Sequence, residues 1–278
     1  MKKLNKYGLK TDKNTYVIAE IGINHGGNIN VAKRLIDSAV RSGADAVKFQ
    51  TYLTEKRAPK NNKEMFDILK KCELPFEAFI KLKEYADNLG VEFFSTAFDE
   101  ESVDFLNDIG CDIFKIASFD VTNHKLLRKV AKTKKNVILS VGMSNIKEVT
   151  EAYKILKEET DNIILLHCIS AYPTNEEDAN LAAIQTLKSK FDCVIGQSDH
   201  TSDIFVPLCA VCAGAQVIEK HFKIDEHMDC VDSPVSITEE QTKKMILQIR
   251  RIENIFGTGV VATTPAQKSV EVFRRFSE

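Results

Sequence analysis

The sequence lacks an excess of charge of either sign, and this narrows the class of protein that it can encode. Its 38 Lys and Arg residues nearly balance 40 Asp and Glu residues, which gives a formal net charge of -2 at pH 7. Proteins that bind nucleic acid or anionic membranes through long-range attraction carry a basic excess. We therefore expect neither a nucleic acid nor a membrane as a partner.

The sequence also lacks a long hydrophobic run. The longest apolar stretch, residues 204–218, contains Pro207, Gly214 and Gln216 and is shorter than the roughly 20 residues that span a bilayer. We interpret it as a buried helix followed by a strand. Low-complexity tracts, Gly/Ser linkers and internal repeats beyond a strand–helix unit are absent too, which favours a single domain over residues 1–278.

A disulfide framework is missing as well. The seven cysteines are an odd number, lie mostly inside expected strands and helices, and follow no signal peptide. This pattern is typical of reduced thiols in the cytoplasm, which is the location that we expect. Cys209 and Cys212 form a CxxC pair without a second pair, and we interpret both as buried small hydrophobic residues rather than a metal or redox site.

The sequence does contain eight hydrophobic, β-branched-rich segments, which alternate with amphipathic stretches long enough for helices. Apolar strands separated by helices indicate a parallel sheet covered by helices, and eight such units in 278 residues match a closed (β/α)8 TIM barrel of class α/β. An open doubly wound sheet is the alternative, but its glycine-rich phosphate turn after the first strand is missing. The strand segments begin at Tyr16, Asp45, Val91, Asp112, Asn136, Asn162, Cys193 and Ala215.

Polar residues stand at or just after the C-terminal ends of these segments. Lys48 and Lys115 are costly in buried strands unless they meet an anion or a carboxylate. Hydroxyl side chains add neutral donors at equivalent heights on other strands, namely Thr96, Ser118, Ser140 and Ser198. Together these groups predict a site for a phosphate or a carboxylate. The alternative is that the lysines only pair with Glu20 and Glu219 inside the barrel mouth.

Two histidines follow neighbouring expected strands. His200 comes after the seventh segment and His221 ends the eighth, so a barrel would bring both imidazoles to one sector of its rim. With Glu219 two residues from His221, the pair predicts a divalent transition-metal site that keeps positions open. His167 lies beside Cys168 on a separate strand, and we interpret it as structural.

The longest polar insert, residues 53–74, follows the second expected strand. A barrel would place it over the active rim as a lid or a substrate loop. The alternative is a charged loop that lies in solvent and has no role in the site. Residues 258–278 are expected to form a C-terminal tail.

Eight motifs occur in order along the chain: AEIGINHGG, DAVKFQTY, FFSTAFDEESVDFL, FKIASFD, ILSVGMS, LLHCISAYPT, GQSDHT and EKHF. Together they resemble the N-acetylneuraminate (sialic acid) synthase family, from about Tyr16 to Phe276. That family also contains synthases for legionaminic and pseudaminic acids, which are bacterial nonulosonic acids. The resemblance implies a metal-dependent barrel that condenses phosphoenolpyruvate with a hexosamine-derived sugar aldehyde and releases inorganic phosphate.

The resemblance also implies roles for individual residues. Phosphoenolpyruvate would be held by the set selected above from the strand ends: Lys48, Thr96, Lys115, Ser118, Ser140 and Ser198. The implied ligands of a divalent metal, in this family manganese, are His200 and His221. Further substrate contacts fall on Gln50 and Tyr172, and catalytic carboxylates on Glu20, Asp120 and Asp232. In the implied mechanism the metal polarises the open-chain aldehyde, C3 of phosphoenolpyruvate attacks it, and water adds to the oxocarbenium carbon before phosphate leaves.

The sequence departs from the family pattern in three places. Asp120 stands where the family usually has Glu, and Ser233 stands where it usually has His. The chain stops at FRRFSE, whereas most members continue into an antifreeze-like domain that supplies an arginine to the neighbouring subunit's sugar site. We expect Lys56, Arg57 and Lys60 of the insert, or a separate protein, to replace that arginine. We also expect a homodimer.

Three functions remain open at this point. The first is an active synthase, and the second is a homologue that binds phosphoenolpyruvate and metal for a regulatory role without turnover. The third is a metal-dependent class II aldolase, which also uses a metal as a Lewis acid but would not need a phosphate site with many donors. The sugar is also open, because KIASFD looks more like the pseudaminic branch while AEIGINHGG and YPT look more like the sialic and legionaminic branches.

Overall fold

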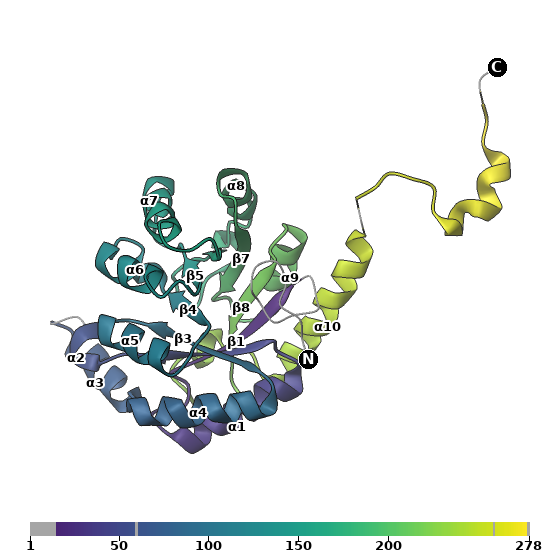
Figure 1. Cartoon of the computed structure of the whole chain (residues 1–278). Helices are drawn as coiled ribbons and strands as arrows, with labels where there is room; N and C mark the ends of the chain where they lie inside the picture. The colour runs from purple at the N-terminus through teal and green to yellow at the C-terminus, as the bar shows by residue number, and fades with distance from the viewer. Residues whose placement is uncertain (1–14, 59–60, 258, 277–278) are drawn as a thin grey trace.

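Eight parallel strands form a closed barrel in sequence order, and the last strand pairs with the first. The computed structural model describes residues 15–58, 61–257 and 259–276. The strands appear in Figure 1 and are β1 (Tyr16–Gly22), β2 (Ala46–Thr51), β3 (Glu92–Ala97), β4 (Ile113–Ile116), β5 (Asn136–Ser140), β6 (Ile163–His167), β7 (Val194–Asp199) and β8 (Val217–His221). The predicted (β/α)8 barrel is confirmed.

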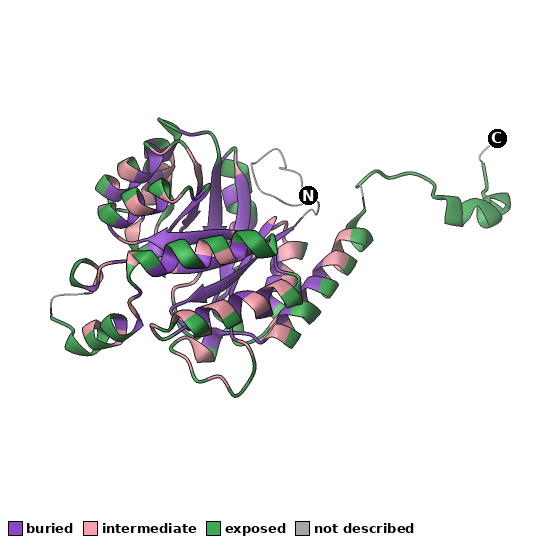
Figure 2. Cartoon of the chain, turned by 60° about the horizontal axis from the view of Figure 1, so that its bottom comes forward, coloured by how far each residue is buried: buried purple, intermediate pink, exposed green. Residues whose placement is uncertain are grey.

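Helices follow the strands and cover the outside of the barrel, with a buried face toward the strands and an exposed face outward (Figure 2). Local sequence sets their ends: Asn28 caps the first helix by accepting from the amides of Asn30 and Val31, and Gly43 ends it at a φ of 87°. The covering helices are α1 (Ile29–Ser42), α4 (Phe76–Leu89), α5 (Glu100–Asp108), α6 (His124–Ala131), α7 (Ile146–Lys157), α8 (Ala182–Lys190), α9 (Phe205–Cys212) and α10 (Glu239–Phe256).

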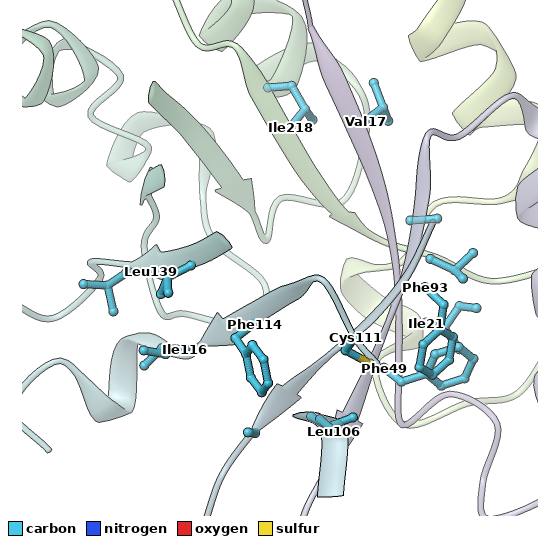
Figure 3. Close-up of a cluster of buried hydrophobic side chains, with 14 of the residues drawn as sticks. Val17, Ile21, Phe49, Phe93, Leu106, Cys111, Phe114, Ile116, Leu139 and Ile218 are labelled. Atoms are coloured by element: carbon cyan, nitrogen blue, oxygen red, sulfur yellow. The ribbon is translucent and has the colours of Figure 1, made fainter. Parts of the chain in front are cut away.

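Two apolar layers lie on the two faces of the barrel wall. Alternate residues of each strand point to opposite faces, so Val17 joins the layer between strands and helices while Tyr16 and Ile18 join a separate cluster inside the barrel. Figure 3 shows part of the outer layer, in which the rings of Phe49 and Phe93 stack with centroids 5.3 Å apart. Burial on both faces explains why the strands read as nearly continuous hydrophobic segments.

One buried ion pair in the barrel wall carries a testable stability effect. Lys220 Nζ lies 2.6 Å from Asp199 Oδ2, and the two side chains are only 1% and 2% exposed. We expect Lys220→Met to cost about 3 kcal/mol in the free energy of unfolding, because it leaves a buried carboxylate without its cation. Denaturant unfolding measures this cost. The matched control is Lys157→Met, which breaks the surface pair with Asp161 and should cost under about 1 kcal/mol. Equal costs for the two variants would contradict the expectation.

Residues 259–276 are exposed throughout and include the 3-10 helix η4 (Pro265–Phe273). Figure 1 shows this segment extending away from the barrel; residues 258, 277 and 278 of the expected tail lie outside the described residues. The CxxC pair lies on α9, as expected, but Cys209 is half-buried and Cys212 is exposed, so the interpretation of both as buried is wrong. Among the described residues, no helix combines the length and apolar character needed to cross a bilayer.

Candidate active site

The positions that face the barrel interior change from apolar to polar toward one end of the strands. Ile18 and Ala46 belong to the interior cluster, and two residues further along their strands come Glu20 and Lys48, which pair in register. The same change on other strands gives Thr96, Lys115, Ser140, Ser198 and Glu219. Because all strands run in the same direction, these side chains converge at the carboxyl-terminal end of the barrel, where this fold builds its active sites.

A cavity of about 360 Å³ opens at this end of the barrel. Every residue predicted to act in catalysis or to hold phosphoenolpyruvate, the sugar or the metal lines it, except Asp120 and, in the insert, Lys56 and the undescribed Lys60. The lining residues from that set are Glu20, Lys48, Gln50, Arg57, Thr96, Lys115, Ser118, Ser140, Tyr172, Ser198, His200, His221 and Asp232.

Two buried lysines and two buried glutamates form a connected cluster in the cavity. Lys48 Nζ lies 3.0 Å from Glu20 Oε2 and 3.6 Å from Glu219 Oε2, and it donates to Thr96 Oγ1 at 3.0 Å. Lys115 Nζ lies 3.6 Å from Glu219 Oε1. The pairs that the sequence left open as an alternative are therefore formed.

The two lysines differ in how well their charge is compensated. Burial acts against the charge of Lys48, but Glu20 and Glu219 outweigh it and hold the Lys48 pKa above its ordinary value. For Lys115 burial prevails over the attraction of Glu219 and lowers the pKa. Lys115 is thus the cation with more to gain from an anionic ligand.

Several donors in the cavity are left for a ligand. Ser140 Oγ is buried and makes no hydrogen bond to any described group. Lys115 Nζ makes one long hydrogen bond, to the Ile116 carbonyl at 3.4 Å, and the Ser118 hydroxyl meets only that of Ser170, at 2.8 Å. Leaving buried donors unpaired costs free energy, so an acceptor placed among them would be stabilised. A carboxylate or phosphate oxygen meets that requirement.

The two imidazoles lie together beside this cluster. Their ring centroids are 5.4 Å apart, and the ring of Tyr172 lies 4.2 Å from that of His200. His200 Nδ1 is 2.7 Å from the carbonyl oxygen of Ile169, which can only accept, so Nδ1 carries the proton and Nε2 keeps a free lone pair. His221 Nδ1 lies 3.3 Å from Asp232 Oδ2.

The surroundings move the pKa values of the two imidazoles in opposite directions. Burial, reinforced by His221, lowers the pKa of His200 to about 3. Burial also acts to lower the pKa of His221, but the carboxylate of Asp232 outweighs it and raises the value. His200 is therefore neutral under physiological conditions, as a metal ligand must be.

These histidines fit a divalent transition metal. Metal-binding imidazoles usually donate their second nitrogen to a carbonyl or a carboxylate. Ile169 provides the carbonyl for His200, and the Asp232 carboxylate lies 3.3 Å from His221 Nδ1. In the part of the chain that the structure describes, no three His, Cys, Asp or Glu side chains gather into a complete ligand set. The donors suit a metal that takes its remaining ligands from water or substrate.

Asp120 is the assigned residue that the structure does not bring into the cavity. It lies in the 3-10 helix η1 (Ser118–Asp120), and its carboxylate accepts from Asn123 Nδ2 at 2.9 Å. Burial raises the pKa of Asp120. Its predicted catalytic role has no support from the geometry and stays a prediction.

The insert after β2 is helical and forms part of the cavity wall. It contains α2 (Thr54–Arg57) and α3 (Lys63–Cys72), and the lining residues that it contributes are Arg57, Met65, Ile68 and Leu69. The three basic residues expected there behave differently. Arg57 faces the cavity, Lys56 forms a 2.6 Å pair with Glu101 and is not among the lining residues, and Lys60 lies outside the described residues.

Glu219 is more central than the sequence analysis assumed. Besides its contacts with both lysines, it accepts from Ser198 Oγ at 2.8 Å. Burial acts against its charge, but Lys115 and Lys48 outweigh it and hold its pKa below the ordinary value. The signal that could have found it is its spacing: Val217, Glu219 and His221 alternate on the interior face of β8.

Cys168 also lines the cavity, and no sequence signal pointed to it. Its sulfur accepts from the Gly142 amide at 3.2 Å. A Cβ at position 142 would lie 2.7 Å from that sulfur and 2.5 Å from Ser170 Oγ, so only glycine fits this turn after β5. This close packing fixes the cavity wall next to Ser118.

Comparison with known proteins gives consistent matches along the chain. An uncharacterized protein of Methanocaldococcus jannaschii is 48% identical over 264 residues, covering 95% of this chain and 78% of that protein. The N,N'-diacetyllegionaminic acid synthase of Campylobacter jejuni is 41% identical over 280 residues, covering 95% of this chain and 84% of the synthase. The crystal structure of N-acetylneuraminic acid (sialic acid) synthetase from Leptospira borgpetersenii in complex with citrate matches with a TM-score of 0.92 at 40% identity, over 96% of this chain and 93% of that one. Residues 35–261 match the NeuB family. The chain therefore belongs to the NeuB family, as its resemblance to sialic acid synthases predicted.

Proposed function

We propose that this protein condenses phosphoenolpyruvate with an N-acetylhexosamine-type aldehyde to give a nonulosonic acid and inorganic phosphate. Relatives named as synthases of legionaminic and sialic acids support the reaction class. The observation that carries the proposal is one cavity that holds two buried lysines, the unpaired hydroxyl of Ser140 and two adjacent imidazoles. The lysine side suits an anion, and the histidine side suits a polarised carbonyl.

Phosphoenolpyruvate occupies the lysine side in this proposal. Lys115 and Ser140 have donors to spare, so they accept the anionic groups without giving up strong hydrogen bonds. Lys48 remains paired with Glu20, and this carboxylate keeps the Lys48 ammonium protonated. The remaining hydroxyl donors on this side are Thr96, Ser118 and Ser198.

A divalent metal, for which we propose manganese, would be held by Nε2 of His200 and by His221. When bound, it supplies a Lewis acid that polarises the carbonyl oxygen of the sugar aldehyde. Asp232 orients His221 through its contact with Nδ1, and Ile169 orients His200. The Tyr172 ring packs against His200 at 4.2 Å and meets His221 edge-on at 6.0 Å.

The atoms balance with one water molecule per turnover. C3 of phosphoenolpyruvate forms a bond to the aldehyde carbon, water adds its oxygen at C2, and the C2–O bond to phosphate breaks. Glu20 lies between the lysine side and the histidine side of the cavity. Its Oε1 accepts from Gln50 at 3.0 Å, and its Oε2 lies next to Lys48. We assign it the role of accepting the proton of the incoming water.

Phosphate release tests this function against its alternatives. The protein is mixed with phosphoenolpyruvate, Mn2+ and a panel of hexosamine-derived sugars. A synthase releases phosphate only when a suitable sugar is present. A homologue without catalytic activity binds phosphoenolpyruvate in calorimetry but releases no phosphate with any sugar, and a class II aldolase shows no dependence on phosphoenolpyruvate.

A further inference from the structure

A charged residue stands directly before each of the two imidazole residues and points to the opposite face of the barrel wall. Asp199 precedes His200 at the end of β7, and Lys220 precedes His221 at the end of β8. Asp199 and Lys220 pair in register between the two strands. Successive side chains of a strand point to opposite faces, so the imidazoles reach the cavity while the charged pair enters the outer layer, to which Ile218 belongs.

The Asp199 carboxylate also holds the backbone that carries His200. Its Oδ2 accepts from the amide of Thr201 at 3.2 Å and from the hydroxyl of Thr201 at 2.7 Å. An aspartate that accepts from the amide two residues further on closes an Asx turn, and the middle residue of this turn is His200. Lys220 Nζ lies 2.6 Å from the same Oδ2 and donates to the Thr201 carbonyl. The two strands are therefore joined directly beside both imidazole residues.

This unit is polar where the outer layer is apolar on other strands. Near the ends of β4 and β5 the outer layer contains Ile116 and Leu139, whereas Asp199, Thr201 and Lys220 are each only 2% exposed. Replacing a buried ion pair by apolar residues of similar volume often costs no stability and can increase it. The charged pair is therefore better explained by the geometry that it imposes than by the stability that it contributes.

The strand ladder does not by itself fix the relative position of the two imidazoles. Its last pair between β7 and β8 is Asp199 with Lys220. His221 is held further by pairing with Glu20 of β1, but His200 lies one residue past the end of β7. Groups of a functional site must be held within about 0.5 Å of their productive geometry. The Asx turn, anchored on the neighbouring strand by Lys220, supplies a constraint at His200 that the ladder does not.

We propose that Asp199, Thr201 and Lys220 are positioning residues, which set the separation and the orientation of the His200 and His221 rings from behind the barrel wall. None of the three is among the residues that line the cavity, so they act through the imidazoles. The inference rests on the metal site of the proposed function and deepens it, because it assigns the precision of that site to a buried unit outside the cavity.

Titration of Mn2+ followed by electron paramagnetic resonance tests the inference in two variants of the pair. Lys220→Met removes the cation that anchors the Asp199 carboxylate, and we expect the affinity for Mn2+ to fall roughly tenfold to a hundredfold, as for other outer partners of metal ligands. The double variant Asp199→Leu, Lys220→Met replaces the pair by apolar side chains, so it should regain stability toward denaturant while its affinity for Mn2+ stays low. The calorimetric affinity for phosphoenolpyruvate should change less than that for Mn2+.

Two further variants separate positioning from stability. Leu127→Ala opens a cavity under α6, between β4 and β5 in the chain, and should bind Mn2+ like the native protein although it is less stable. Thr201→Val keeps the ion pair and removes only the hydroxyl bond to Asp199. We expect it to lose less Mn2+ affinity than Lys220→Met, and it decides the question if the pair variants do not fold. Native Mn2+ affinity in the double variant or in Thr201→Val, or an equal loss in Leu127→Ala, would overturn the inference.

The tautomer of His200 in the metal-free protein separates this inference from the proposed function. Nitrogen-15 NMR of the imidazoles distinguishes a proton on Nδ1 from a proton on Nε2. In the native protein the Ile169 carbonyl keeps the proton of His200 on Nδ1, and a ring released by Lys220→Met should show both tautomers. That result would support the inference even if the native protein bound no Mn2+ and the metal proposal failed. An unchanged tautomer in the pair variants would overturn it, whether or not Mn2+ binds.

Discussion

Lys115→Met is expected to remove most of the affinity for phosphoenolpyruvate and most of the phosphate release. Lys115 is buried, and its polar contacts among the described residues are a 3.6 Å pair with Glu219 and a long hydrogen bond to a backbone carbonyl. A charge-assisted hydrogen bond to an anion in such a site contributes about 2–4 kcal/mol, so kcat/KM should fall roughly 30- to 1000-fold. Calorimetry with phosphoenolpyruvate and a phosphate-release assay measure the two effects.

The control for this prediction is Lys223, a buried lysine outside the cavity. Lys223 lies 3.1 Å from Glu226 and does not line the cavity. Lys223→Met should therefore leave the affinity for phosphoenolpyruvate unchanged. An unchanged affinity in Lys115→Met, together with normal phosphate release, would show that the lysine cluster serves only to neutralise its own glutamates.

Loss of either imidazole is expected to abolish metal binding while the barrel stays folded. His200→Ala and His221→Ala each remove a proposed direct ligand, and the cost should exceed the roughly 10- to 100-fold loss that follows removal of an outer partner. Asp232→Asn, which weakens the partner of His221 Nδ1, should show that smaller loss. Titration of Mn2+ followed by electron paramagnetic resonance measures affinity independently of activity.

His124 provides the comparison for these variants. It lies on α6, and its side chain is 42% exposed. It does not line the cavity, and its charged neighbour is Glu151 at 3.8 Å. His124→Ala should bind Mn2+ like the native protein. Full activity after exhaustive chelation, or unchanged Mn2+ binding in both active-site variants, would rule out the assigned metal site.

The sequence predicted the barrel and most of the site because both follow from one regularity. Polar residues such as Lys48 and Lys115 stand out in strands that are otherwise apolar, and parallel strands must bring such residues to the same end. The alternation that defines the interior face then places the hydroxyls and the imidazoles in the same cavity. Strand order suffices for these groups, whereas Gln50, Tyr172 and Asp232 were assigned only from the family resemblance.

The remaining features depend on contacts between distant segments. Arg57 and Lys56 are neighbours in sequence, and only the position of Tyr52 and Phe98 decides which one reaches the cavity. The sequence likewise could not show that the Asp120 carboxylate accepts from Asn123 in the turn after β4, and the catalytic role of Asp120 stays a prediction. Loop geometry of this kind is set by packing, which periodicity and composition do not encode.

Mass-spectrometric identification of the product tests the central claim most directly. The protein is incubated with phosphoenolpyruvate, Mn2+ and each N-acetylhexosamine of a panel, and the products are compared with the amount of phosphate released. The account predicts one product whose mass is that of the sugar plus pyruvate, formed in equal amount to phosphate. Free pyruvate in equal amount to phosphate, with the sugar unchanged, would contradict it, since the cavity would then hydrolyse phosphoenolpyruvate without forming a carbon–carbon bond.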